Sequence, residues 1–199
     1  MNILTVADGH GHFYEEAVSR EATGKPVPDI ILFLGDNDYY DLDAVVSVYP
    51  KVPKFGVLGN HDMILDGKPT VLDEAGIPNI HLKTVECNGI IIGGFEGSIR
   101  YKDSTCYPLY TGGESVELLA DFPYCDLFIT HSPPQFFEPD NITSHTGLLG
   151  IGKYVREKRP QVHLYGHLHQ PESSMYMATA ERCCYGIEWH KFLFTNEKR

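Results

Sequence analysis

Five short polar motifs hold the residues best suited to chemistry, and each follows directly on an apolar run. The motifs are Asp8-Gly9-His10, Gly35-Asp36, Gly59-Asn60-His61-Asp62, His131 and Gly166-His167-Leu168-His169. Their carboxylate, amide and imidazole groups form a mixed oxygen and nitrogen donor set without thiolates. Such a set favours transition-metal ions over an all-oxygen Mg²⁺ or Ca²⁺ cage. The candidate metal ligands are Asp8, His10, Asp36, Asn60, His131, His167 and His169.

These seven candidate ligands exceed what one tetrahedral ion accepts, so the set predicts two metal ions. Two ions about 3.5–4 Å apart can bridge a hydroxide and clamp a phosphoryl group for in-line attack. The donor types favour Mn²⁺, with Fe, Zn²⁺ and Ni²⁺ left open. The motifs therefore predict a binuclear metal site that acts on phosphoesters.

The apolar runs before the motifs predict buried strands, because they are rich in β-branched residues and end at Gly or polar residues. The predicted strands span residues 2–7, 30–34, 54–58, 90–95, 126–130 and 162–165, and the predicted helices span 13–22, 42–48, 67–75, 114–120 and 148–158. This alternation predicts an α/β fold with largely parallel pairing, in which ligands bind outside the carboxyl ends of the strands. Residues 174–178 and 191–195 are predicted to form a closing hairpin or edge, and residues 100–113 a surface excursion.

In their order along the chain, the motifs read D-x-H, G-D, G-N-H-[DE], H and G-H-x-H, and they resemble the signatures of the calcineurin-like metallophosphoesterase superfamily over residues 8–169. The resemblance implies a four-layer α-β-β-α sandwich. Residues 93–98, 130–134 and 159–169 resemble the small cytosolic phosphodiesterase-like members that lack a cap domain. Accordingly, we expect one metallophosphoesterase domain over residues 1–199.

The resemblance also implies a role for each motif residue. Asp8, His10 and His169 would hold the first metal, Asn60, His131 and His167 the second, and Asp36 would bridge them. His61 would be the catalytic histidine that stabilises the transition state and protonates the leaving oxygen, a task that suits the neutral-range pKa of a histidine. A bridging hydroxide would attack phosphorus.

One position departs from the family pattern. The second signature is often G-D-x-x-D, whose last Asp orients the catalytic histidine, but Tyr39 stands there in this chain. Asp38, Asp41 or Asp62 are the alternatives for orienting His61.

Substrate contacts are expected from Asn60 and His61, with His12 and Arg100 as further candidates. His12 follows His10 in the first loop, and the alternative for it is a structural or solvated role. Arg100 offers bidentate geometry for a phosphate oxygen, and the alternative for it is a solvated loop. The remaining histidines are predicted to be ordinary surface or core residues: His81, His145, His163 and His190.

Charge and composition restrict the partners. The net charge of -11 argues against long nucleic acids and anionic membranes, both of which need a basic surface. No apolar run approaches the roughly 20 residues that span a bilayer, and the first residues lack the basic start of a signal peptide. We therefore expect a cytoplasmic protein with five reduced cysteines, a small phosphoester substrate, and a monomeric or homodimeric state.

The leading hypothesis is a dimetal hydrolase of phosphodiesters of small molecules or nucleotides. Phosphomonoesterase or protein phosphatase activity is an alternative, although Tyr40-Asp41 replaces the Arg-Gly that protein phosphatases carry in that region. A nuclease is a third possibility. A non-catalytic scaffold module, as in the retromer subunit of this fold, is an alternative from another class, and the presence of His61 with every ligand favours the enzyme.

Overall fold

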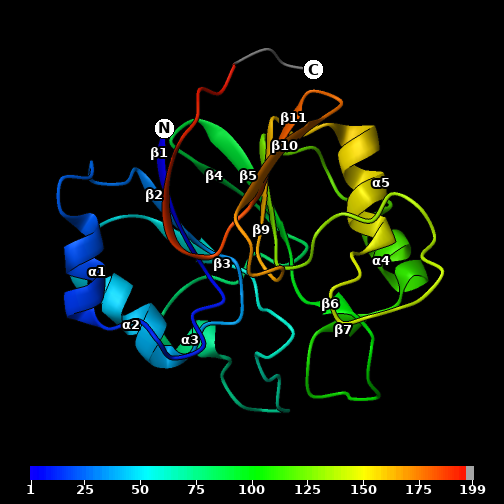
Figure 1. The fold of residues 1–199 in the computed structure, drawn as a ribbon, viewed down its shortest axis with the longest axis horizontal. Helices are drawn as coiled ribbons and strands as arrows, with labels where there is room; N and C mark the ends of the chain where they lie inside the picture. Colours follow the sequence, from blue (N-terminus) through cyan, green and yellow to red (C-terminus); the bar gives the residue numbers. More distant parts are fainter. Residues whose placement is uncertain (196–199) are drawn as a thin grey trace.

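Two β-sheets pack face to face in the computed structural model, which describes residues 1–195 (Figure 1). The first sheet has the order β12 (Gly186–Lys191), β1 (Asn2–Ala7), β2 (Ile30–Phe33) and β3 (Lys54–Gly56). The second has the order β10 (Glu172–Tyr176), β11 (Thr179–Cys183), β9 (Val162–Tyr165), β8 (Leu127–Thr130), β5 (Ile90–Phe95) and β4 (Thr84–Cys87). A short parallel pair consists of β6 (Ser98–Ile99) and β7 (Leu109–Tyr110).

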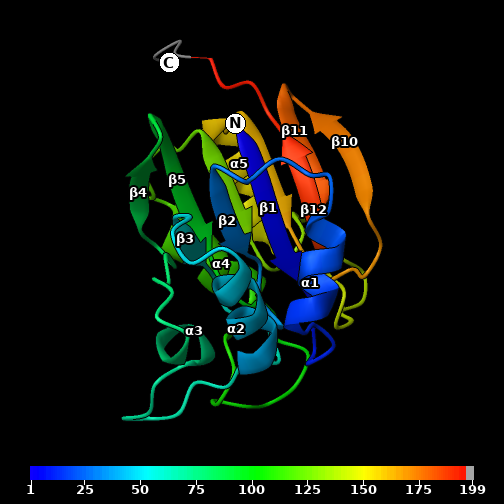
Figure 2. The same cartoon turned by 90° about the vertical axis from the view of Figure 1, so that its left-hand side faces the viewer.

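Helices cover the outer face of each sheet. The helices beside the first sheet are α1 (Glu15–Ala22), α2 (Tyr39–Val48) and α3 (Val71–Glu74), and those beside the second are α4 (Gly112–Leu119) and α5 (Leu149–Lys158) (Figures 1 and 2). This arrangement confirms the predicted four-layer α-β-β-α sandwich. The central strands are parallel, with Ile3 opposite Ile30 in the first sheet and Leu127 opposite Val162 in the second.

The central strands are apolar on both faces because each sheet has a neighbouring layer on either side. In β1, Ile3 faces the other sheet and Leu4 faces the helices, and both are fully buried. On the far side, α4 and α5 approach closely at Gly150, where an added Cβ would lie 2.1 Å from the Ser115 carbonyl oxygen. The layers therefore hold the strand ends in fixed positions.

The predicted central strands and the five helices are confirmed to within a few residues, but the C-terminal part is wrong in detail. The last strand is β12 at Gly186–Lys191, not at residues 191–195. Four further strands were not predicted: β4, β6, β7 and β11, of which β7 lies within the stretch expected to be a surface excursion. β12 pairs antiparallel with β1 and forms the edge of the first sheet. Its polar residues Glu188 and His190 interrupt the continuous apolar run that predicts a buried strand. Within residues 1–195, no helix is long and apolar enough to cross a membrane, and none of the five cysteines forms a disulfide.

Candidate metal centre

The loops after β1, β2, β3, β8 and β9 meet at the carboxyl ends of the parallel strands, and there the candidate ligands come together. Asp8, His10 and His169 offer ligand atoms that lie within 4.8 Å of one another, and so do Asp36, His131 and His167. The structure thus brings together the residues that the resemblance implies for each ion, and it places Asp36, the expected bridge, beside His131 and His167, with the Asn60 amide next to them. Backbone hydrogen bonds join the loops: the His10 N–H donates to the Asp36 carbonyl at 3.2 Å, and the Gly166 N–H donates to the His131 carbonyl at 3.0 Å.

In the second cluster, lone pairs face one another. The Nδ1 of His131 lies 2.8 Å from the Leu34 carbonyl and must donate to it, so Nε2 is left as an acceptor. That Nε2 lies 2.9 Å from Asn60 Oδ1, 3.4 Å from Asp36 Oδ2 and 3.1 Å from His167 Nδ1. The His167 Nε2–H donates to the Ser144 carbonyl, which makes its Nδ1 an acceptor as well. With a neutral His131 ring, four acceptors converge here and need a positive charge between them. In the absence of a metal a proton on His131 Nε2 supplies that charge, and a divalent cation fits the same donor set.

The pKa values of the ionisable groups in this cluster also indicate that it favours a cation. Burial lowers the pKa of His131, but the Asp36 and Asp8 carboxylates and the Leu34 carbonyl together raise it, to about 9. Burial together with the adjacent His131 lowers the pKa of His167 to about 3. Burial also opposes ionisation of Asp36, yet His131 holds the pKa of that carboxyl well below its usual range. The surroundings of His131 Nε2 therefore favour a cation, while His167 stays neutral and able to ligate.

The first cluster contains an orphaned carboxylate oxygen. Asp8 is 3% exposed, and among residues 1–195 its Oδ1 has no hydrogen-bond donor, although His169 Nε2 stands 3.4 Å away. The other oxygen, Oδ2, accepts the His167 backbone N–H at 2.9 Å, and burial raises the pKa of the carboxyl. The His10 ring lies against the rings of His169 and His61, with centroids 5.5 and 5.6 Å apart. A buried carboxylate oxygen beside two imidazoles is a fitting place for a second cation.

The backbone conformation at several of these residues sets the direction of their side chains. The candidate ligands in the left-handed region are Asp8 (φ 54°), His10 (47°), Asp36 (54°), His167 (72°) and His169 (54°). Non-glycine residues rarely adopt this region, and such strain concentrates at functional sites. Gly59 lets the third loop approach the second, because a Cβ there would lie 2.1 Å from Asp36 Oδ1.

Asp38, Asp41 and Asp62 hold loops rather than the catalytic histidine. Asp62 accepts the Gly59 N–H at 2.7 Å and the Asp36 N–H at 3.0 Å on one oxygen, and burial with Asp36 nearby raises its pKa to about 7. Asp41 accepts the N–H groups of Gly11 and Phe13, both at 2.8 Å, and Asp38 caps α2. Within the described residues 1–195, none of the three carboxylates forms a hydrogen bond with the His61 imidazole.

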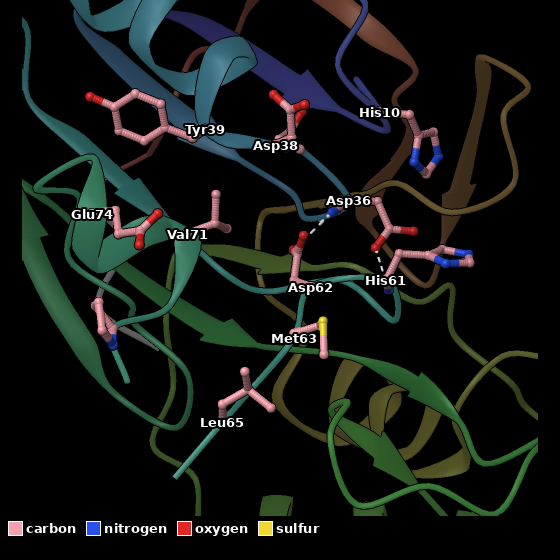
Figure 3. A pocket seen from close by; sticks show the side chains of 12 residues that line it. His10, Asp36, Asp38, Tyr39, His61, Asp62, Met63, Leu65, Val71 and Glu74 are labelled. Atoms are coloured by element: carbon pink, nitrogen blue, oxygen red, sulfur yellow. Dashed lines mark hydrogen bonds between the residues drawn. The ribbon is translucent and has the colours of Figure 1, made fainter. Parts of the chain in front are cut away.

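His61 borders a cavity of about 340 Å³ (Figure 3). Its backbone N–H donates to Asp36 Oδ1 at 2.8 Å, and its side chain and that of His10 flank Asp36. Met63 and Leu65 line the far side of the cavity, and both are more than two-fifths exposed. The imidazole therefore stands beside the bridging candidate, at the mouth of a space that admits a small molecule.

The comparisons with known proteins bear on this site. The sequence matches the family described as calcineurin-like phosphoesterase over residues 1–171. The chain belongs to this family. Membership confirms the resemblance in the five motifs, and with the two ligand clusters it supports a metal-dependent phosphoesterase.

Solved structures share the fold of this calcineurin-like phosphoesterase. TT1561 of Thermus thermophilus has a TM-score of 0.61 and 15% identity, over 95% of this chain and 97% of that one. The phosphopantetheinyl hydrolase PptH of Mycobacterium tuberculosis has a TM-score of 0.59 and 12% identity, over 93% and 89% of the two chains. At such identities the likeness shows the fold alone. No curated protein sequence matches the chain.

Two further substrate candidates lie outside the ligand clusters. The His12 imidazole bonds to the Gly9 carbonyl of its own loop at 2.9 Å. The Arg100 guanidinium donates to the Leu109 carbonyl at 3.0 Å and pairs with Glu114 at the start of α4. Both side chains are thus engaged by neighbouring parts of the chain.

The structure brings one more histidine to this calcineurin-like centre than the motifs predicted. The ring centroid of His145 lies 5.3 Å from that of His167 and 6.3 Å from that of His169. His145 lies in the loop between β8 and α5, outside every motif, and no spacing in the sequence connects it to the ligands. Only the three-dimensional return of this loop over the strand ends could reveal it.

Proposed function

We propose that this chain is a phosphodiesterase that hydrolyses small phosphodiesters and uses two divalent metal ions, with Mn²⁺ the best match to the donor types. The observation that carries the proposal is the convergence of three acceptor atoms, Asn60 Oδ1, Asp36 Oδ2 and His167 Nδ1, on His131 Nε2. In this proposal Asp8, His10 and His169 would hold one ion, Asn60, His131 and His167 would hold the other, and Asp36 would serve both. When bound, the ions would supply a nucleophilic hydroxide and neutralise charge on the phosphoryl oxygens.

The protein's own groups then position the substrate and handle the proton. Asn60 and His61 border the place where a phosphoryl group would lie between the two clusters. The His61 imidazole is held through its backbone by Asp36, so it can deliver a proton to the departing alkoxide oxygen. Since no fixed carboxylate partner holds its ring among residues 1–195, we propose that the contact with His10 orients it.

Two cavities favour a diester over a monoester. One of about 340 Å³ borders His61, and another of about 500 Å³ borders His145, and they share no lining residue. A phosphodiester has two organic substituents, and each cavity offers space for one of them. The net charge of -11 further favours small substrates over long polyanions.

The test compares two chromogenic esters on one preparation. Protein stripped of metal and reloaded with Mn²⁺ should hydrolyse bis(p-nitrophenyl) phosphate with a higher kcat/KM than p-nitrophenyl phosphate. His61→Ala should lower kcat about 10²- to 10⁴-fold, the usual contribution of a general acid, while its metal content stays the same. No turnover of either ester by fully loaded protein refutes the phosphoesterase, and preference for the monoester refutes the diester assignment.

A further inference from the structure

A third group of potential metal ligands lies apart from the strand ends that carry the five motifs. Cys184, Glu188 and His190 each offer one ligand atom, and the three atoms lie within 4.8 Å of one another. Cys184 directly follows β11 of the second sheet, and the other two residues belong to β12 of the first sheet, on the same side of the molecule (Figure 2). No motif in the sequence connects these three residues.

Strand β12 turns its polar face toward the other sheet. Ile187 and Trp189 pack with the layer of helices, so Glu188 and His190, which alternate with them, point into the space between the two sheets. Cys184 is fully buried among the apolar residues of that space. The side chains of His190 and Glu188 are 10% and 27% exposed, so this group is reached from solvent at the edge of the sandwich.

Three polar groups approach the same ring nitrogen of His190. Thr5 Oγ1 lies 2.9 Å from Nε2, Cys184 Sγ lies 3.7 Å from it, and Glu188 Oε2 lies 3.8 Å from it. A neutral imidazole nitrogen makes one hydrogen bond, either as donor or as acceptor, and the Thr5 hydroxyl is at the distance for that bond. More groups therefore face Nε2 than hydrogen bonding to this nitrogen accounts for.

The separations suit a tetrahedral zinc ion. From the usual zinc bond lengths, a sulfur and a nitrogen ligand lie about 3.5 Å apart, and a nitrogen and an oxygen ligand about 3.4 Å apart. The observed 3.7 and 3.8 Å are close to these values. Thiolate, imidazole and carboxylate are all ligands of zinc, and the charges of one thiolate and one carboxylate balance a divalent ion.

The protonation of the two inner groups is compatible with ligation. Burial, and then the charge of Arg182, lower the pKa of the His190 imidazole to about 4, so the ring is neutral at neutral pH and keeps a lone pair for a metal. Burial raises the pKa of the Cys184 thiol, so this sulfur becomes a thiolate where an ion replaces its proton. Binding would therefore release one proton to solvent as the metal–sulfur bond forms.

We propose that Cys184, Glu188 and His190 form a zinc site that is separate from the candidate metal centre. The ion would fix the turn between β11 and β12. This turn holds Tyr185, whose N–H donates to Glu188 Oε1 at 2.9 Å and whose ring centroid lies 5.3 Å from that of His169. Zinc would thus have a structural role, and it would steady His169 of the first cluster through Tyr185. The assignment does not rest on the proposed phosphodiesterase function.

Cobalt(II) is the probe that separates this site from the candidate metal centre. A thiolate bound to Co²⁺ gives an intense charge-transfer band in the near ultraviolet, and oxygen and nitrogen ligands do not. The seven candidate ligands of the centre include no sulfur. Co²⁺ is titrated into the full chain after bound metal has been removed with a chelator. We expect the band to appear, and we expect Zn²⁺ to abolish it by displacing Co²⁺, because zinc binds such sites more tightly.

Replacement of the thiol identifies the ligand. Cys184→Ser should abolish the band, with the folded structure confirmed by circular dichroism. Cys183→Ser is the matched control, because Cys183 is also buried but its Sγ contacts the Gly166 carbonyl instead, and it should keep the band. A band that is absent from the unmodified chain, or that persists in Cys184→Ser, would overturn the proposal.

A second variant leaves the buried thiol in place. Glu188→Gln removes the charge of a partly exposed side chain, and the Kd for Co²⁺, measured from the band, should rise about tenfold or more. Glu172→Gln, which changes an exposed carboxylate on β10, is the matched control and should leave the Kd unchanged. Equal Kd values in Glu188→Gln and the unmodified chain would show that the carboxylate is not a ligand, and would overturn the site.

The last measurement uses Asp36→Asn, which should empty the candidate metal centre. The charge-transfer band should remain in this variant, and its loss would overturn the separate site. Zn²⁺ should also raise the Tm of Asp36→Asn, because an ion that binds the folded chain stabilises it, and an unchanged Tm would refute the structural role. If the band depends on Cys184 but the unmodified chain hydrolyses neither chromogenic ester, the zinc site stands and the proposed phosphodiesterase function is wrong.

Discussion

Replacing Asp62 by alanine should detach the loop after β2 from the loop after β3. One oxygen of this carboxylate accepts both the Gly59 and Asp36 N–H groups, at 2.7 and 3.0 Å. Asp62 is only 8% exposed, so water cannot readily replace it. The two loops hold Asp36 and Asn60, and the geometry of the second cluster depends on their separation. The Asp62 side chain thus joins two of the five motifs by hydrogen bonds.

The magnitude follows from the two bonds. Each buried N–H left without an acceptor costs about 1–2 kcal/mol, so Asp62→Ala should lower the free energy of unfolding by about 2–4 kcal/mol. Asp62→Asn is the matched control. Because both bonds end on the same oxygen, the amide oxygen of asparagine can accept both, and the loss should stay below about 1 kcal/mol.

Urea unfolding followed by fluorescence of Trp189, the single tryptophan, measures both variants. Mn²⁺ binding measured by calorimetry on the same samples should weaken in Asp62→Ala and persist in Asp62→Asn. Two results would refute this role of Asp62. One is an alanine variant as stable as the unmodified chain, and the other is an asparagine variant that loses as much free energy of unfolding as the alanine variant.

Three further outcomes follow from the structure. Gly59→Ala should lower stability and Mn²⁺ content sharply, because its Cβ would lie 2.1 Å from Asp36 Oδ1, whereas Gly113→Ala, with no atom within 4 Å, should be neutral or stabilising by up to about 1 kcal/mol. Asp36→Asn should lose both ions together in metal analysis, and retention of both would exclude the bridging role. Burial lowers the pKa of His190 to about 4, so below its unfolded value near 6.5 only the unfolded chain gains a proton. The neutral His190 therefore causes no loss of stability above pH 6.5, and the free energy of unfolding falls by about 2 kcal/mol between pH 6.5 and pH 5. His190→Gln should remove this part of the pH dependence in urea titrations.

The sequence could predict those strands whose own residue types indicate a buried strand. β1 and β2 are apolar runs because both of their faces are covered, so their type and limits are readable from the chain. β4, β11 and β12 mix polar and apolar residues and lie at or near sheet edges, where pairing with a neighbour decides the conformation. The register of β12 against β1 depends on contacts across most of the sequence.

The candidate ligands were predictable for a related reason. Each stands at the end of a readable strand, and parallel strands bring their ends to one edge. The supporting groups were not predictable, because their contacts are long-range. Asp41 anchors a loop about thirty residues away, and Glu181 meets His163 across neighbouring strands. Residue type alone left the choice between Asp38, Asp41 and Asp62 open, and the structure gives all three a backbone-holding role.

The left-handed backbone at the ligands has an evolutionary consequence. A glycine at His10 or His169 would relieve about 1 kcal/mol or more of strain at φ of 47° or 54°. Selection for stability alone would therefore replace these residues, and under the proposed function it is the retention of metal binding that opposes this drift. A descendant of this chain that loses its reaction should show it first as glycine or asparagine at these positions, long before the sandwich itself changes.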